Sequence, residues 1–289
     1  MLNAWPLDEA YIDYVVDGAG ETVLGGIVND PEILETIDAE GLAALNQADS
    51  EENVATGYHA IEFLLWGQDL RADGAGDRPF ADYVDGAENV ERRRAYLEAV
   101  STLLIQQVEE VRGAWDPDAG DSYRAEMIAA ADEDPREPIR RILFGMGSLS
   151  GAELAGERMN VAYMTKEQED EHSCFSDTTY QDHLYDAMGI RNAYLGTYTR
   201  TDGTVVSGPS LSDLVAARDP ELDAELRGQL DASIAAIQAI PRPFDQAILG
   251  SDDAPGRVAI RAAVDALRDQ TQSIAEVAAL LGVTLNLEE

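Results

Sequence analysis

The chain has 289 residues, enough for one large domain or two of ordinary size, and its 56 acidic against 20 basic residues give a formal net charge of −36. That charge excludes a nucleic-acid partner, because phosphate contacts need clustered Lys and Arg side chains. The single cysteine excludes an internal disulfide and a metal site of several thiolates, and neither an apolar run of about 20 residues nor a secretory leader is visible.

Residues 1–130 predict a first half built of helices. A short helix is expected after Pro6, with acidic residues in its first turn, and a second helical stretch is expected from residue 30. Residues 50–53 resemble a cap for the helix that carries His59. A glycine-rich loop over residues 71–79 precedes a long amphipathic helix. The apolar face of that helix comprises Leu97, Val100, Leu104, Val108 and Val111.

Residues 131–289 predict a second helical half, with the seam near residues 130–137. Its first helix is rich in glycine, which favours close packing against another helix. A polar stretch over residues 163–182 leads to an apolar-periodic run, residues 199–209 suit an irregular excursion or a short hairpin, and two long helices follow. Their apolar positions are Leu222, Leu226, Leu230, Ile234 and Ile237, then Ile260, Val264, Leu267, Ile274, Val277 and Leu281. Because no strand alternation of any length is visible, the predicted fold class is all-α with helical bundles.

His59 and Glu62 form the first candidate functional pair. On a helix of about 3.6 residues per turn they project from one face of an otherwise apolar segment. Burying an unpaired polar group costs on the order of 2–7 kcal/mol, so a metal ion, a proton or a salt-bridge partner is expected beside them. The zinc-peptidase patterns H-E-x-x-H and H-x-x-E-H are both absent, because each needs a second histidine one turn away.

The polar stretch of the second half holds two further groupings. Glu169 and His172 have the Glu-x-x-His spacing that supplies di-metal ligands in ferritin-like bundles. Asp177, Asp182 and His183 bring two carboxylates and an imidazole close together in sequence. A solvated acidic loop is the alternative explanation for both groupings.

Glu153 and Arg158 form the last grouping, in which the guanidinium could clamp a carboxylate or make an interhelix salt bridge. A buried hydrogen bond is likewise the structural alternative for His59. Taken together, the groupings of carboxylate with imidazole favour a site for a hard or borderline metal cation. The strongly negative surface would assist by concentrating cations.

Five ordered motifs carry a family resemblance. Residues 57–67 read Gly-Tyr-His-Ala-Ile-Glu-Phe-Leu-Leu-Trp-Gly and resemble the G-x-H-x-x-E motif of the imelysin family, also called the M75 peptidase family. The segments at residues 3–15, 147–159, 171–177 and 189–192 resemble the iron-regulated branch of that family, so the resemblance covers nearly the whole chain.

The resemblance implies an all-helical protein of two pseudo-repeated bundle halves, residues 1–130 and 131–289, with the site in the cleft between them. It also implies a periplasmic or lipid-anchored location in the cell envelope and a role in iron acquisition beside other iron-uptake envelope proteins. Family members carry a leader and a further helical stretch ahead of the segment that begins at Asn3. The first half is therefore expected to be incomplete at its N-terminus.

Carried over residue by residue, the resemblance predicts metal ligands at His59, Glu62, His172 and Asp177 and ligand-binding groups at Glu153 and Arg158. Tyr180 departs from the pattern, since it stands where a histidine is expected in the iron-regulated branch. The bound ion is expected to be divalent or ferric, with iron favoured over zinc.

Three hypotheses remain open at this point. The first is an envelope protein that binds a metal ion or an iron-containing ligand. The second is a metallopeptidase in which the metal lowers the pKa of a bound water to about 7 and Glu62 is the catalytic general base. The third is a non-catalytic binding module in which His59 and Glu62 only hold a buried polar network.

Overall fold

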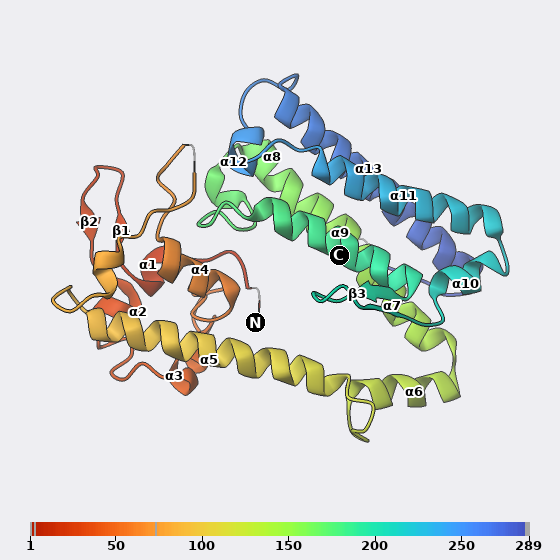
Figure 1. Cartoon of the computed structure of the whole chain (residues 1–289), viewed down its shortest axis with the longest axis horizontal. Coiled ribbons are helices and arrows are strands. Elements are labelled where there is room, and N and C mark those ends of the chain that lie inside the picture. Colours follow the sequence, from red (N-terminus) through yellow and green to blue (C-terminus); the bar gives the residue numbers. More distant parts are fainter. Residues whose placement is uncertain (1, 3, 73, 287–289) are drawn as a thin grey trace. The chain divides into compact units, whose positions relative to one another are not determined.

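Helices supply most of the regular structure in both parts of the chain, as the computed structural model shows (Figure 1). It describes residues 2, 4–72 and 74–286, so Asn3 of the first family motif lies outside the described residues. The chain divides into two compact units, unit 1 being Met1–Ser122 and unit 2 Tyr123–Glu289, and the predicted domain boundary at residue 130 stays a prediction. The all-α prediction is confirmed, with two short hairpins added among the described residues. The predicted repeat between the halves stays a prediction.

Unit 1 surrounds one long helix with short ones. Its helices are α1 (Glu9–Ile12), α2 (Gly26–Asn29), α3 (Ala39–Leu45), α4 (Tyr58–Trp66), the 3-10 helix η1 (Phe80–Tyr83) and α5 (Val90–Ala114). Helices α2, α3 and α4 and the 3-10 helix all pack on α5. The strands β1 (Val15–Val16) and β2 (Thr22–Val23) form an antiparallel hairpin with Val15 opposite Val23. At two residues each, these strands are too short for a visible alternation.

Two predicted helix starts in unit 1 are wrong. The segment after residue 30 forms turns, and the next helix begins only at Ala39, where the Asp38 carboxylate accepts the N–H of Gly41 at 2.8 Å. The expected cap at residues 50–53 is not used either. Helix α4 instead follows Gly57, whose φ of +95° suits glycine and no other residue well.

The predicted apolar face of α5 is only partly buried. Val100 lies in the core, whereas Val108 and Val111 are 43% and 50% exposed. The buried face is rotated because Arg93 and Tyr96 also point inward, the latter donating from its hydroxyl to the Ala55 carbonyl at 2.9 Å. Polar groups with buried partners therefore define this face, and hydropathy periodicity alone does not reveal them.

Unit 2 is a helical bundle. Its helices are α6 (Tyr123–Glu133), α7 (Arg136–Ser148), the π-helix η2 (Leu149–Asn160), α8 (Val161–Thr165), the 3-10 helix η3 (Gln168–Asp170), α9 (Thr179–Leu195), α10 (Leu211–Ala216), α11 (Pro220–Gln238), α12 (Phe244–Ala247) and α13 (Pro255–Leu280). Helix α13 packs on α11 and η2, and α9 packs on the same two, so these four close a ring of contacts (Figure 1). The expected hairpin is confirmed as β3 (Thr197–Thr199) paired with β4 (Val205–Ser207).

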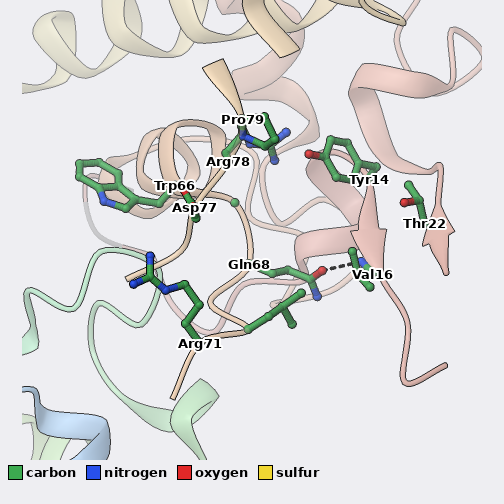
Figure 2. Close-up of a pocket in the computed structure, with 11 residues that line it drawn as sticks. Tyr14, Val16, Thr22, Trp66, Gln68, Arg71, Asp77, Arg78 and Pro79 are labelled. Carbon is green, nitrogen blue, oxygen red and sulfur yellow. Dashed lines mark hydrogen bonds between the residues drawn. The ribbon is translucent and has the colours of Figure 1, made fainter. Parts of the chain in front are cut away.

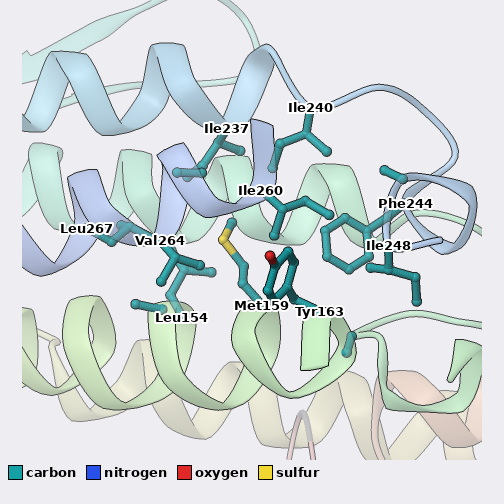
Figure 3. Close-up of a cluster of buried hydrophobic side chains, with 14 of the residues drawn as sticks. Leu154, Met159, Tyr163, Ile237, Ile240, Phe244, Ile248, Ile260, Val264 and Leu267 are labelled. Carbon is teal, nitrogen blue, oxygen red and sulfur yellow. The ribbon is translucent and has the colours of Figure 1, made fainter. Parts of the chain in front are cut away.

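Apolar side chains from η2, α11, α12 and α13 meet in the centre of this bundle (Figure 3). Leu154, Met159, Ile260 and Leu267 are all fully buried there. A second cluster joins α7, α9, α10, α11 and the end of α13. The three- and four-residue spacing of the long helices thus predicted their buried faces, except that Leu222, Ile234 and Leu281 are only partly buried.

The π-helix η2 continues directly from α7 and was not predicted. The close packing expected of its glycines is found at Gly151, where a Cβ would lie 3.0 Å from Cγ2 of Thr271 on α13. Ser150 lies beside it, fully buried, and donates to the Leu267 carbonyl at 2.9 Å. The small side chains of this segment therefore bring η2 close to α13.

Candidate functional site

Helix α4 places His59 and Glu62 on one buried face. Nδ1 of His59 and Oε2 of Glu62 are 2.8 Å apart, and the two residues are 2% and 8% exposed. The edge of the His59 ring also meets the Trp5 indole, with ring centres 5.1 Å apart. The contact with the Glu62 carboxylate therefore fixes the orientation of the imidazole ring.

The ends of α4 are set by glycines. Gly57 precedes the helix at φ +95°, and Gly67 follows it at φ +69° with its N–H on the Phe63 carbonyl at 2.7 Å. Phe63 and Leu64 are fully buried and anchor the helix in the unit 1 core. In the family motif G-x-H-x-x-E, the glycine is thus Gly57, which precedes the helix at a positive φ. The histidine and the glutamate are His59 and Glu62, which lie about one turn apart on the same helix face.

A second buried polar centre in unit 1 surrounds Asp13 and was not predicted from the sequence. Asp13 is fully buried and accepts from Nε and Nη2 of Arg93 at 2.6 and 2.9 Å and from Nη1 of Arg78 at 2.8 Å. The Tyr14 hydroxyl donates to Asp82 at 2.7 Å, and burial together with this hydrogen bond raises the pKa of Tyr14 to about 12. The charges of this centre are thus paired with one another inside unit 1.

The π-helix brings Glu153 and Arg158 together in unit 2. Residues five apart in an α-helix are turned by about 140° from one another. In a helix with i→i+5 hydrogen bonds they lie one above the other, and Nη2 of Arg158 approaches Oε2 of Glu153 to 3.4 Å. The predicted pairing of these two residues therefore depends on a helix type that the sequence did not reveal.

His172 lies in a carboxylate-rich pocket of side chains between η3 and α9. Its Nδ1 is 3.4 Å from Oδ2 of Asp182, which also accepts from the Ser173 hydroxyl at 2.6 Å. Asp186, one turn further along α9, has a raised pKa, chiefly because it is buried and despite the lowering effect of His172 and Arg158. Asp186 was missed because a single acidic residue in an acidic chain carries no sequence signal.

His183 is fully buried next to this group. Its ring stacks on that of His172 with centres 6.2 Å apart and meets Phe244 edge-on at 4.9 Å. Burial, reinforced by His172, lowers the pKa of His183 to about 3, so the imidazole is neutral. Among the residues that the structure describes, neither ring nitrogen of His183 has a hydrogen-bond partner.

Comparison with known families settles what kind of chain this is. The family model for imelysin, peptidase family M75, matches residues 1–274. The chain belongs to the imelysin family. A crystal structure described as that of a "putative iron-regulated protein A precursor" from Parabacteroides distasonis has the same fold, with a TM-score of 0.68 and 20% sequence identity over 96% of this chain and 74% of that one. The comparison with curated proteins gave no match.

The imelysin fold thus places the predicted site residues in two groups. His59 and Glu62 are together in unit 1, while Glu153, Arg158 and His172 gather around Asp186 in unit 2. Asp177, also in unit 2, has a left-handed φ of +54° between Ser176 and Thr178, whose hydroxyls are 2.7 Å apart.

A complete metal site is not assembled by this imelysin-family chain within the described ranges. No group of three or more His, Cys, Asp or Glu side chains there is placed to hold a metal ion. In the same residues, no helix is long and apolar enough to cross a membrane.

Proposed function

We propose that this imelysin-family chain binds iron in the cell envelope, in the form of a complex that brings most of its own donor atoms. His59 is the residue that would coordinate the iron, through Nε2. The observation that carries this proposal is the buried hydrogen bond of 2.8 Å between His59 and Glu62. Such a bond orients the imidazole and fixes its tautomer, as carboxylates do for metal-bound histidines.

The donor count favours an iron complex over a bare ion. A bare ion would need three or more protein ligands, and no such group exists among the described residues. An iron complex with one open position needs a single imidazole.

The polar residues of unit 2 are proposed as ligand-binding groups of that unit, with no part in activating the ligand. Arg158 offers guanidinium donors to an acceptor on the complex, and Glu153 orients Arg158 from 3.4 Å away. His172 and Asp177 are proposed as further metal-side contacts.

Iron and the envelope enter the proposal through similarity. The structural neighbour is named as iron-regulated and as a precursor. By the same reasoning, other iron-uptake proteins of the envelope are the expected partners.

A metallopeptidase is the second candidate, and it rests on the family description. In that case a metal held at His59 would activate water, and Glu62 would be the general base. The bond from His59 to Oε2 of Glu62 favours an orienting role instead. The two functions separate in a Glu62→Gln protein, which would keep bound metal but lose all peptide cleavage if the chain were a peptidase.

Thermal unfolding with added ferric citrate, ferrous ion or zinc ion tests the proposal. Wild-type protein should show a saturable rise in melting temperature with ferric citrate that is absent from His59→Ala. Arg112→Lys, which changes a side chain that is 72% exposed on α5 and makes none of the proposed contacts, is the control and should keep the response. An equal response in His59→Ala, or none in wild type, would overturn the proposal.

A further inference from the structure

Unit 1 contains a pocket on the side of the Asp13 network that faces the end of α4 (Figure 2). Its volume of about 320 Å³ lies at the lower end of the range for small-molecule sites. Tyr14 and Thr22 stand on one side, with Trp66 and Arg71 on the other (Figure 2). The remaining lining comes from Val16, from Gly67, Gln68 and Leu70 after α4, and from residues 77–79.

The walls of this pocket are fixed by hydrogen bonds and by close backbone packing. The Gln68 amide accepts the Val16 N–H at 2.5 Å and donates to Glu9 at 2.7 Å, which ties the segment to β1 and α1. Gly76 lies so close to the backbone that a Cβ would come 2.6 Å from the Trp66 carbonyl oxygen. The pocket is therefore formed before a ligand arrives, which lowers the entropic cost of binding.

Arg78 offers the polar anchor. Its side chain is 1% exposed, and its Nη1 donates hydrogen bonds to the carboxylates of both Asp13 and Asp82. Within the described part of the chain, Nε of Arg78 has no hydrogen-bond partner, although it is buried. It lies over Gly67 in the pocket wall, 3.5 Å from where a Cβ of that glycine would be. A buried guanidinium donor without an acceptor calls for a ligand that supplies one.

The other lining groups favour a ring and a negative charge. Trp66 is 38% exposed and Leu70 64% exposed, so apolar surface lies open at the pocket. The lining holds two guanidinium groups, on Arg71 and Arg78, and one carboxylate, on Asp77. Because the Arg78 guanidinium is already paired with Asp13 and Asp82, the donor it can offer an anion is Nε, which has no hydrogen-bond partner among the described residues.

We propose that this pocket is a binding site for a small aromatic carboxylate. The carboxylate would accept from Arg78, and the ring would lie against Trp66 and Leu70. This site goes beyond the proposed iron binding and does not depend on it, because none of its lining residues is His59 or Glu62.

Ligand-observed NMR titration of the whole chain in about 0.15 M salt tests the proposal, with benzoate and benzamidine as probes of equal size and opposite charge. Benzoate should bind saturably, with a dissociation constant of about 1 mM or lower, and at least tenfold more tightly than benzamidine. No saturable binding, or equal binding of the two probes, would overturn the proposal.

Two variants locate the site. Thr22→Phe fills the pocket from the exposed strand β2 and should abolish benzoate binding. Arg78→Lys keeps a charge for Asp13 but removes Nε, and it should weaken benzoate binding about tenfold. Arg112→Lys changes an arginine that is 72% exposed on α5 and is the matched control with wild-type affinity. Wild-type affinity in a folded Thr22→Phe protein would contradict the assignment even if Arg78→Lys fails to fold.

Discussion

Replacing His183 by phenylalanine should remove one defined part of the acid sensitivity of unit 2. The imidazole is fully buried, and burial lowers its pKa from 6.5 to about 3, with His172 adding to the effect and Asp182 opposing it. Since the folded-state pKa is the lower one, the unfolded chain binds the extra proton. His183 therefore costs no stability above pH 6.5, and stability falls as the pH drops from 6.5 toward 3.

The size of the effect follows from this shift. Within the window, each pH unit costs about 1.4 kcal/mol of unfolding free energy. Between pH 7.5 and pH 5, the wild-type protein should lose about 2 kcal/mol through His183 alone. Phenylalanine keeps the ring contacts to His172 and Phe244 and sacrifices no hydrogen bond, so at pH 7.5 the variant should lie within about 1.5 kcal/mol of wild type.

Urea unfolding of both proteins at pH 7.5, 6.5 and 5 measures this difference. The many carboxylates titrate in both proteins, so their contribution cancels when the variant is compared with wild type at each pH. The difference in unfolding free energy should shift by about 2 kcal/mol in favour of the variant between pH 7.5 and 5. A difference that stays constant with pH would show that His183 is not held neutral by burial.

Two further predictions concern packing and buried charge. Asp13→Ala should destabilise unit 1 by about 3–5 kcal/mol in urea unfolding, because the buried guanidinium groups of Arg93 and Arg78 lose a carboxylate partner. The control is Asp85→Ala, at a side chain that is 91% exposed, which should change the unfolding free energy by less than about 1 kcal/mol. Equal effects of the two substitutions would refute the reasoning. Gly151→Ala should destabilise unit 2 by about 1–3 kcal/mol because its Cβ would press on Thr271. Gly145→Ala meets nothing within 4 Å and should stabilise the helix by up to about 1 kcal/mol, so a melting-temperature shift of the same sign in both would contradict this account.

The long helices of unit 2 were predictable because their buried faces are apolar. Ile260, Leu267 and Ile274 repeat at helical spacing over many turns, and burial of these side chains follows directly. Unit 1 was harder to predict. Its helix α3 is capped by the Asp38 side chain, whereas α4 follows Gly57, which has a φ of +95° and makes no side-chain cap. In a sequence, a glycine in that position is typical of a loop.

The candidate site was predictable only in part. The i, i+3 spacing of His59 and Glu62 predicted their common face, and the structure adds the hydrogen bond between them. The contact between Glu153 and Arg158 requires the π-helix, which no pattern of residues in the sequence predicted. Arg78 and Asp186 were missed because their roles come from burial and neighbours that lie far away in the sequence, beyond the reach of local periodicity.

Iron bound through His59 is the central claim, and iron K-edge X-ray absorption of the loaded protein tests it most directly. Wild-type protein exposed to ferric citrate and then desalted should retain about one iron per chain with an imidazole nitrogen in its coordination shell. Glu62→Gln should retain the nitrogen but bind about 10–100-fold more weakly, and His59→Ala should lose both the imidazole signal and the retained iron. Retention of iron with an unchanged spectrum in His59→Ala would contradict the account.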